Sequence, residues 1–331
     1  MDTPPPTSPT SEQRNARGEW RPSYPVTYAP IFVWPPKLTA FLKWLFGYPG
    51  YLWPWNVIYA AIALLTWLYL TPSLETCATL QWEWAGLVFL RNLALLWIMA
   101  GTWHFLLYNL KLAGTRKKYD AKWQSTKNPS FIFKDQVYDN IFWSCASGCT
   151  IWTAYEVLYL WAAGNHLVPL ISIREHPVYA IVLLLLIPFW REFHFYCIHR
   201  LIHWKPLYRK VHYLHHKNVN PGPWSGLAMH PVEHLLYFSV VLIHWVIPSH
   251  PIHFIFNLQH TALTPIPSHN GFEGPVLTDK LPSGSYFHYL HHRYFECNYG
   301  ESTLPLDKWF GTFRDGLPGG KGAKLPEKEQ V

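Results

Sequence analysis

The sequence predicts an all-α integral membrane protein with about four transmembrane helices, a half-membrane hairpin and a cytoplasmic helical cap. Half of the 331 residues are hydrophobic and 14% are charged, against roughly 25% charged residues in an ordinary soluble domain. The 19 tryptophans and 20 tyrosines are typical of side chains at membrane–water interfaces. Several apolar runs also approach the roughly 20 residues that a helix needs to cross a bilayer. Together these features favour membrane insertion over a buried soluble core.

Four apolar runs are predicted to cross the membrane: 55–70, 93–110, 141–163 and 177–190. The fourth run is short for a full crossing, so we expect its helix to continue beyond the bilayer. The third run carries a single acid, Glu156. An acid at membrane depth often marks a functional site, but Glu156 lies toward the outer end of its run, where we expect it to reach water.

A fifth apolar run, residues 235–257, contains Pro248 and Pro251 in its middle. Proline lacks a backbone N–H and clashes with the preceding helical turn, so two prolines three residues apart interrupt a helix. We therefore expect two half-length helices that form a hairpin without crossing the membrane.

Positive charges are distributed unevenly between the segments that connect these runs. Segments 111–134 and 191–217 carry seven and six Lys and Arg residues, whereas 71–84 carries none and 164–176 only Arg174. Cytoplasmic loops are enriched in Lys and Arg, so four crossings with both termini inside place the basic segments in the cytoplasm. We attribute the net charge of +7 to this sidedness. Nucleic-acid binding is disfavoured because the basic residues form no recognisable binding motif.

Histidine is unusually frequent, with 19 residues, and eight of them fall into three short clusters. On a helix, positions i, i+3 and i+4 share an arc of about 100°. We therefore expect each triplet to direct three imidazoles at one point. The clusters are an HxxxH pair, His199 and His203, and two HxxHH triplets, His212, His215 and His216, and His288, His291 and His292.

Eight clustered imidazoles indicate more than one metal ion. A catalytic zinc keeps three protein ligands and one open position, whereas eight nitrogens suit two metals with room for O2. A lone histidine would more often be a hydrogen-bonded core residue, but the repeated spacing is hard to explain that way. A metal transporter, or a membrane protein that binds metal without catalysis, is the alternative from another class. Transporters place their ligands near the membrane midplane, whereas these clusters adjoin basic cytoplasmic segments.

The sequence around the clusters resembles the membrane-bound fatty acid hydroxylase and sterol desaturase superfamily, and the sterol desaturase branch most. The family pattern of HxxxH, HxxHH and HxxHH is similar to 199–203, 212–216 and 288–292, and the resemblance covers roughly residues 140–315. The flanking motifs that carry it are His199-Arg200, Met229-His230-Pro231-Val232-Glu233, Ser268-His269-Asn270-Gly271-Phe272-Glu273, Asn298-Tyr299-Gly300 and Leu306-Asp307-Lys308-Trp309-Phe310-Gly311-Thr312.

The resemblance implies a non-haem centre of two iron ions, with the eight box histidines as catalytic metal ligands. It also implies His269 as a ninth ligand, and His230 and Glu233 as a further ligand or as groups that support one. Reactions of the superfamily consume O2 and two electrons, which an external donor such as cytochrome b5 or ferredoxin with its reductase supplies. Glu192, Glu233, Glu273, Glu301 and Asp307 are candidate acceptors for ligand N–H groups, and any of them can equally be a surface charge.

The remaining histidines carry weaker expectations. His194, His234 and His260 are undecided between ligand and bystander. The others are expected to be interfacial or hydrogen-bonded: His104, His166, His176, His244, His250 and His253.

The resemblance leaves the substrate open among membrane lipids. We expect hydroxylation or desaturation of a lipid, with a sterol favoured and a fatty-acyl chain, sphingolipid or carotenoid as alternatives. The expected location is a multi-pass position in the endoplasmic reticulum of a eukaryote or the cytoplasmic membrane of a bacterium, with the active site on the cytoplasmic side. The expected organisation is a disordered or interfacial tail (1–50), a transmembrane pair with a basic loop (51–135), a fatty acid hydroxylase-like catalytic domain (136–315) and a flexible tail (316–331).

Overall fold

The computed structural model describes residues 14, 18–23, 26–276 and 281–316. Every regular element in this part of the chain is a helix, and extended pairing is limited to four isolated bridges. The all-α prediction is therefore confirmed. The predicted C-terminal tail, apart from Gly316, lies outside the described residues, as do residues 1–13, 15–17 and 24–25 of the predicted N-terminal tail.

Three helices are long and apolar enough to cross a membrane: Leu52–Tyr69, Trp82–Asn109 and Pro177–Ile202. The second begins eleven residues before the expected run at residue 93 (93 − 82 = 11). The third continues past residue 190 into the first histidine pair, as predicted. Their component elements are η3 (Leu52–Asn56), α2 (Val57–Tyr69), α4 (Trp82–Leu96), η4 (Trp97–Gly101), α5 (Thr102–His104), η5 (Phe105–Asn109) and α8 (Pro177–Ile202).

The run expected at 141–163 lies in a continuous helix made of α6 (Gln136–Trp143), η6 (Ser144–Cys149) and α7 (Thr150–Gly164). This helix is not among the three that are apolar enough to span. Its acid, Glu156, is 1% exposed, so the expectation that it reaches water is wrong.

Glu156 instead pairs with an arginine of the neighbouring helix. Its Oε1 lies 2.6 Å from Nη2 of Arg91, and its Oε2 accepts a hydrogen bond from Asn92 at 3.0 Å. Buried charges are tolerated when they are paired and hydrogen-bonded. The pairing with Glu156 therefore explains how the apolar helix α4 can contain the buried Arg91. The pair joins α4 to α7.

The predicted hairpin is present. Its first arm is α11 (Pro231–Phe238) with η9 (Ser239–Trp245), and its second is α12 (Pro251–Leu263). The helix is interrupted between Trp245 and Pro251, as the two prolines predict. The tip reaches the segment that follows α7, because Ser249 exchanges backbone hydrogen bonds with Pro169 and Ile171.

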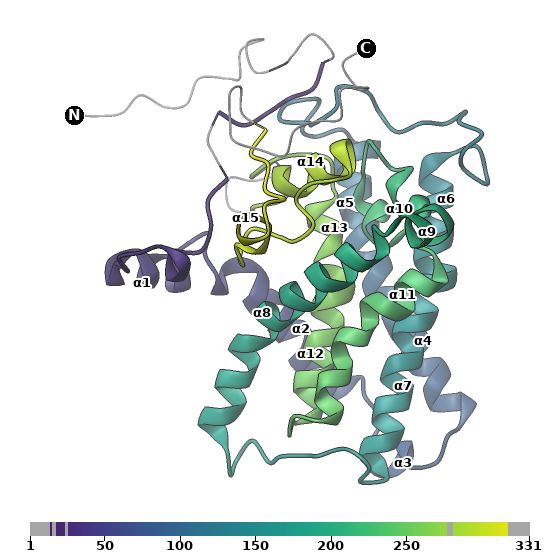
Figure 1. Cartoon of the computed structure of the whole chain (residues 1–331). Helices are drawn as coiled ribbons and strands as arrows, with labels where there is room; N and C mark the ends of the chain where they lie inside the picture. The colour runs from purple at the N-terminus through teal and green to yellow at the C-terminus, as the bar shows by residue number, and fades with distance from the viewer. Residues whose placement is uncertain (1–13, 15–17, 24–25, 277–280, 317–331) are drawn as a thin grey trace.

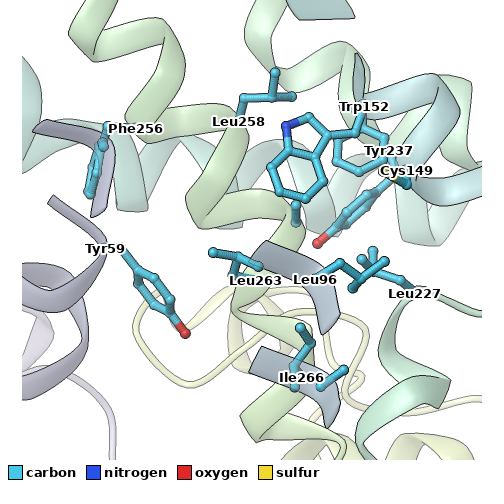
Figure 2. Close-up of a cluster of buried hydrophobic side chains, with 14 of the residues drawn as sticks. Tyr59, Leu96, Cys149, Trp152, Leu227, Tyr237, Phe256, Leu258, Leu263 and Ile266 are labelled. Atoms are coloured by element: carbon cyan, nitrogen blue, oxygen red, sulfur yellow. The ribbon is translucent and has the colours of Figure 1, made fainter. Parts of the chain in front are cut away.

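The second arm of the hairpin is the centre of the fold. Every residue of α12 except Ile252 is buried, and the helix packs against α2, α7 and α8. A helix that is buried on all sides needs neighbours around it and partners for its polar side chains, such as Gln259, which donates to Thr66 of α2. Phe256, Leu258 and Leu263 of α12 meet Tyr59 of α2 and Trp152 of α7 in the main core (Figure 2).

Large apolar side chains remain exposed on the outer helices. Examples are Leu68 of α2, Leu90 of α4 and Ile181 of α8, whose exposed fractions are 56%, 60% and 60%. Exposed apolar surface of this extent marks contact with lipid or another apolar partner. The short helix α1 (Leu38–Phe46) lies beside the bundle (Figure 1) and contains no buried residue.

The histidine clusters lie at one end of the bundle, where α10, α13 and α14 gather, and α3 lies at the other (Figure 1). The remaining elements are short: η2 (Pro30–Phe32), α3 (Leu74–Cys77), α9 (Lys205–Leu207), η7 (Tyr208–His212), α10 (Tyr213–His216), η8 (Pro223–Leu227), α13 (Pro265–Ser268), α14 (Tyr286–Tyr294) and α15 (Leu306–Trp309).

Candidate metal centre

Four segments supply the predicted ligands. The end of α8 carries His199 and His203, and η7 with α10 carries the first triplet. His269 follows α13, and α14 carries the second triplet. The start of α14 is fixed by Ser285, whose hydroxyl accepts a hydrogen bond from the backbone N–H of His288, a typical N-cap.

The structure brings all nine predicted histidines into two adjoining groups. The atoms that could bind metal lie within 4.8 Å of one another inside each group. Ring centroids of His216 and His292, which belong to different groups, are 5.1 Å apart. The five-histidine group is His199, His203, His212, His216 and His291, and the four-histidine group is His215, His269, His288 and His292.

Each HxxHH triplet is divided between the groups, so the expectation that a triplet converges on one point is wrong. His212 and His216 belong to one group and His215 to the other, and the second triplet is divided in the same way. The reason is angular. Residues i and i+4 lie about 40° apart around a helix axis, whereas i+3 lies about 60° away on the other side. One helical turn can therefore contribute to two neighbouring sites.

Backbone carbonyls fix the tautomers of several rings. Nδ1 of His199 donates to the carbonyl of Tyr299 at 2.6 Å, and Nδ1 of His291 to that of Cys297 at 2.6 Å. Nδ1 of His269 donates to the carbonyl of Pro265 at 2.8 Å. A carbonyl can only accept, so the proton resides on Nδ1, and Nε2 presents a lone pair to its group.

The Nε2 atoms within each group approach one another closely. Nε2 of His291 lies 3.0 Å from that of His216 and 3.2 Å from that of His203. In the other group Nε2 of His269 lies 3.0 Å from that of His288 and 3.1 Å from that of His292. Several imidazole nitrogens that converge at this distance can bind one cation together. The donor set therefore fits a metal ion in each group.

Burial keeps the imidazoles neutral, which is the form that binds metal. Loss of hydration lowers the pKa of His212 and of His291 well below 6.5. The same cause lowers the pKa of His269 to about 3 and that of His203 to about 2. His203 is the one partly exposed member, and it lines an opening together with Lys205, Arg209 and Phe295.

Glu233 is the acid that contacts a group member. Its Oε1 lies 2.7 Å from Nδ1 of His212, the arrangement by which carboxylates orient histidine ligands. The other four candidate acids have different partners. Glu192 accepts from the backbone of Leu304, Glu301 from Arg191, Glu273 from Tyr119 and the backbone of Tyr286, and Asp307 from Thr312 and the backbones of Tyr299 and Gly300.

Asp307 supports the ligands through a turn. Its two carboxylate oxygens accept from the N–H groups of Tyr299 and Gly300 at 2.9 and 2.8 Å, and the Tyr299 carbonyl in turn binds His199. Asn298 stands in the left-handed region, with φ 52°, which asparagine tolerates better than most residues. Sequence reasoning missed these carbonyl contacts, although the Asn298-Tyr299-Gly300 motif drew attention to the turn.

His230 lies in neither group. Its Nδ1 accepts a hydrogen bond from the backbone N–H of Val232, so the ring caps the start of α11. The undecided histidines also lie outside the groups with polar partners of their own. His194 contacts Ser239, His234 contacts Ser147 and the Leu227 carbonyl, and His260 contacts Asn56.

A cavity adjoins both groups. Histidines of the five-membered group, such as His199, and of the four-membered group, such as His288, line it together with Phe195, Ile198 and Met229. The cavity has a volume of about 20 Å³, which admits a few atoms beside the histidines and excludes bulk water. We call it the inner cavity.

Comparisons with known proteins agree with this geometry. The fatty acid hydroxylase family model matches residues 182–312. A Delta(7)-sterol 5(6)-desaturase of Gibberella zeae is 34% identical over 37% of this chain and 39% of its own length. A Delta(7)-sterol-C5(6)-desaturase of Nicotiana tabacum is 29% identical over 67% of this chain and 79% of its own length. A Delta(7)-sterol 5(6)-desaturase of Eremothecium gossypii is 28% identical over 38% of this chain and 35% of its own length.

The chain thus spans about two fifths of the two fungal relatives and about four fifths of the tobacco protein. No solved structure matches it. The matched residues include all three histidine clusters and His269. Residues 182–312 thus match the fatty acid hydroxylase family, and the sterol desaturase relatives support a place for the chain in the fatty acid hydroxylase and sterol desaturase superfamily.

Proposed function

We propose that the protein is an oxidoreductase, an O2-dependent non-haem di-iron oxygenase that hydroxylates or desaturates a membrane lipid. A single observation carries this proposal: two adjoining groups of neutral, buried imidazoles border one apolar cavity. Imidazole ligands suit iron as well as zinc, and the relatives named as desaturases favour iron. Their names also favour a sterol as the lipid.

The nine histidines are the proposed ligands, five for one iron and four for the other. Bound iron would supply the activation of O2 and the removal of hydrogen from an unactivated C–H bond. Hydroxylation converts R–H, O2, two electrons and two protons into an alcohol and one water. Desaturation uses the same inputs to form an alkene and two waters. The electrons come from an external donor, for which cytochrome b5 or ferredoxin with its reductase is suitable.

The residues of the chain bind, orient and shield. Tyr299, Cys297 and Pro265 hold Nδ1–H groups through their carbonyls, which leaves each Nε2 available to a metal. Glu233 holds His212 in the same way. The apolar walls of the inner cavity keep bulk water from the reacting carbon.

The proposal includes four membrane crossings, with the helix through α6, η6 and α7 as the fourth, and a cytoplasmic active site. It is supported by the basic residues in 111–134 and 191–217 and by the separation of the histidine end from α3 (Figure 1). The location would be the endoplasmic reticulum of a eukaryote or the cytoplasmic membrane of a bacterium.

Metal analysis and turnover of the purified protein test the proposal. We expect about two irons per chain, and sterol oxidation that requires O2 and a reductant and stops when iron is chelated. A non-catalytic metal-binding protein would hold metal without consuming O2. Full activity with zinc in place of iron, or in the absence of O2, would refute the oxygenase assignment. Fatty-acyl, sphingoid and carotenoid substrates assayed in parallel decide the lipid class.

A further inference from the structure

A second, outer cavity meets the inner cavity at three shared residues. Arg191 of α8, Ser268 of α13 and Glu301 line both cavities. Arg191 and Glu301 therefore lie between the outer cavity and the histidines that line the inner cavity.

Arg191 carries an unused hydrogen-bond donor at the junction. Its side chain is 5% exposed, and Nη2 donates to Oε1 of Glu301 at 3.0 Å. The Nε atom is buried and has no hydrogen-bond partner in the described part of the structure. A buried donor without a partner is unfavourable, so the site is suited to a ligand that brings an acceptor. Glu301 is 27% exposed and retains capacity to accept.

The charges around the outer cavity limit the kind of ligand. Three carboxyl side chains line it, from Glu192, Glu273 and Glu301, against the one guanidinium of Arg191. An anionic head group would face the carboxylates, and a cationic group would face the guanidinium. A neutral hydroxyl satisfies both, because its oxygen accepts from Nε of Arg191 while its proton is donated to a carboxylate oxygen.

The walls of the outer cavity indicate a lipid with a rigid apolar body. Aromatic side chains of Trp44, Tyr51, Trp55 and Tyr59 line it, and flat ring systems pack well against aromatic faces. Trp44 belongs to α1, whose Leu38 and Phe46 are 70% and 61% exposed. A helix with exposed apolar side chains is suited to lie in a membrane interface, so the cavity opens where lipid is available.

We propose that Arg191 and Glu301 bind the hydroxyl group of a neutral polycyclic lipid and thereby select the carbon that is oxidised. This inference rests on the proposed function and specifies its substrate. Because both residues also line the inner cavity with His199 and His288, the oxidised carbon lies only a few bonds from the hydroxyl. A fatty-acyl chain oxidised far from its head group does not meet this condition.

Competition binding to the purified full-length protein in sterol-free nanodiscs tests the inference without requiring turnover. The probe is a tritiated Δ7-sterol with a free 3-hydroxyl, and the competitors are its unlabelled form, its 3-methyl ether, its 3-amine and its 3-sulfate. We expect the ether to compete at least about tenfold more weakly than the alcohol, as the loss of a hydrogen bond to charged groups predicts. The amine and the sulfate should also compete more weakly.

The decisive variant is the double substitution Arg191→Met with Glu301→Leu. Replacing both members of an ion pair by apolar residues avoids the unpaired charge that a single replacement leaves. We expect the alcohol and the ether to compete within about twofold of each other in this variant. The matched control, Arg91→Met with Glu156→Leu, removes a buried Arg–Glu pair that lines neither cavity and should keep the tenfold difference.

If the double variant fails to fold, the single variant Glu301→Gln gives the test. We expect its discrimination between alcohol and ether to lie between the roughly tenfold of wild type and the roughly twofold or less of the double variant. Equal competition by alcohol and ether in wild type, or no saturable binding, overturns the inference. So does tighter binding of the amine or the sulfate, and so does a double variant that retains full discrimination. Intact discrimination in a protein that lacks iron or O2-dependent turnover would refute the proposed function alone.

Discussion

The carboxylate of Glu233 accepts a hydrogen bond from Nδ1 of His212 at 2.7 Å, and both side chains are buried, 2% and 1% exposed. Loss of hydration raises the pKa of the Glu233 carboxyl well above 4.5. A cation at Nε2 of His212 would favour the ionised carboxylate, because opposite charges lower the energy of the charged form. The contact therefore couples the charge of Glu233 to occupancy of the five-histidine group.

Removing this carboxylate should weaken metal binding without emptying the site at once. For Glu233→Ala we expect a loss of roughly 10 to 100-fold in iron affinity or turnover. Glu233→Gln should lose less, because the amide oxygen still accepts from His212. Iron content after dialysis and turnover at saturating substrate measure the effect. Glu83→Ala, at an exposed acid, is the control, and equal losses in the control and Glu233→Ala would contradict this role.

Two buried histidines form a matched pair that separates ligands from bystanders. His291 belongs to the five-histidine group, whereas His244 is 1% exposed and contacts Ser249 and Asn257. We expect His291→Ala to abolish turnover and lower iron content. His244→Ala should lower the free energy of unfolding by about 1–3 kcal/mol, because it leaves buried polar groups unpaired, and should keep the iron. Retained iron and turnover in His291→Ala would refute the ligand assignment.

Asp307 should affect metal retention although it contacts no histidine. Asp307→Ala removes the acceptor of two backbone N–H groups in the turn that orients His199. We expect roughly tenfold weaker iron retention, by analogy with other groups that orient ligands. Asp135→Ala is the comparison, because Asp135 also binds backbone N–H groups, at the start of α6. That change should lower stability by about 1 kcal/mol and leave the iron content unaltered.

The orientation in the membrane is tested by single cysteines at opposite ends of the bundle. Leu80 and Lys127 are both exposed, in the segment near α3 and in the basic segment. In a background without the five native cysteines, a membrane-impermeant thiol reagent should label Lys127→Cys in sealed vesicles whose cytoplasmic face points outward. Leu80→Cys should react only after permeabilisation. The reverse pattern would invert the proposed sidedness.

Local patterns in the sequence predicted much of the site. The spacing of the histidine boxes identified eight of the nine grouped histidines, whereas His269 was implied only by the family resemblance. The short run at 177–190 correctly indicated a helix that continues past it, and Pro248 and Pro251 correctly located the break in the hairpin. These predictions succeed because helical periodicity and proline chemistry depend on a few neighbouring residues.

The features that the sequence did not predict depend on contacts between distant segments. Arg91 and Glu156 are 65 residues apart (156 − 91 = 65), so neither residue alone indicated that Glu156 is buried and paired. The division of His215 from His212 and His216 depends on where α14 and His269 lie. The carbonyls that bind His199 and His291 are backbone atoms, which residue identity does not specify.

The division of ligands has a consequence for biosynthesis. Residues 199–216 supply four of the five histidines of one group but only His215 of the other. The missing ligands lie after the hairpin, at His269 and in α14. A nascent chain that ends within the hairpin therefore has neither proposed site complete, and both are complete only when residue 292 has been added.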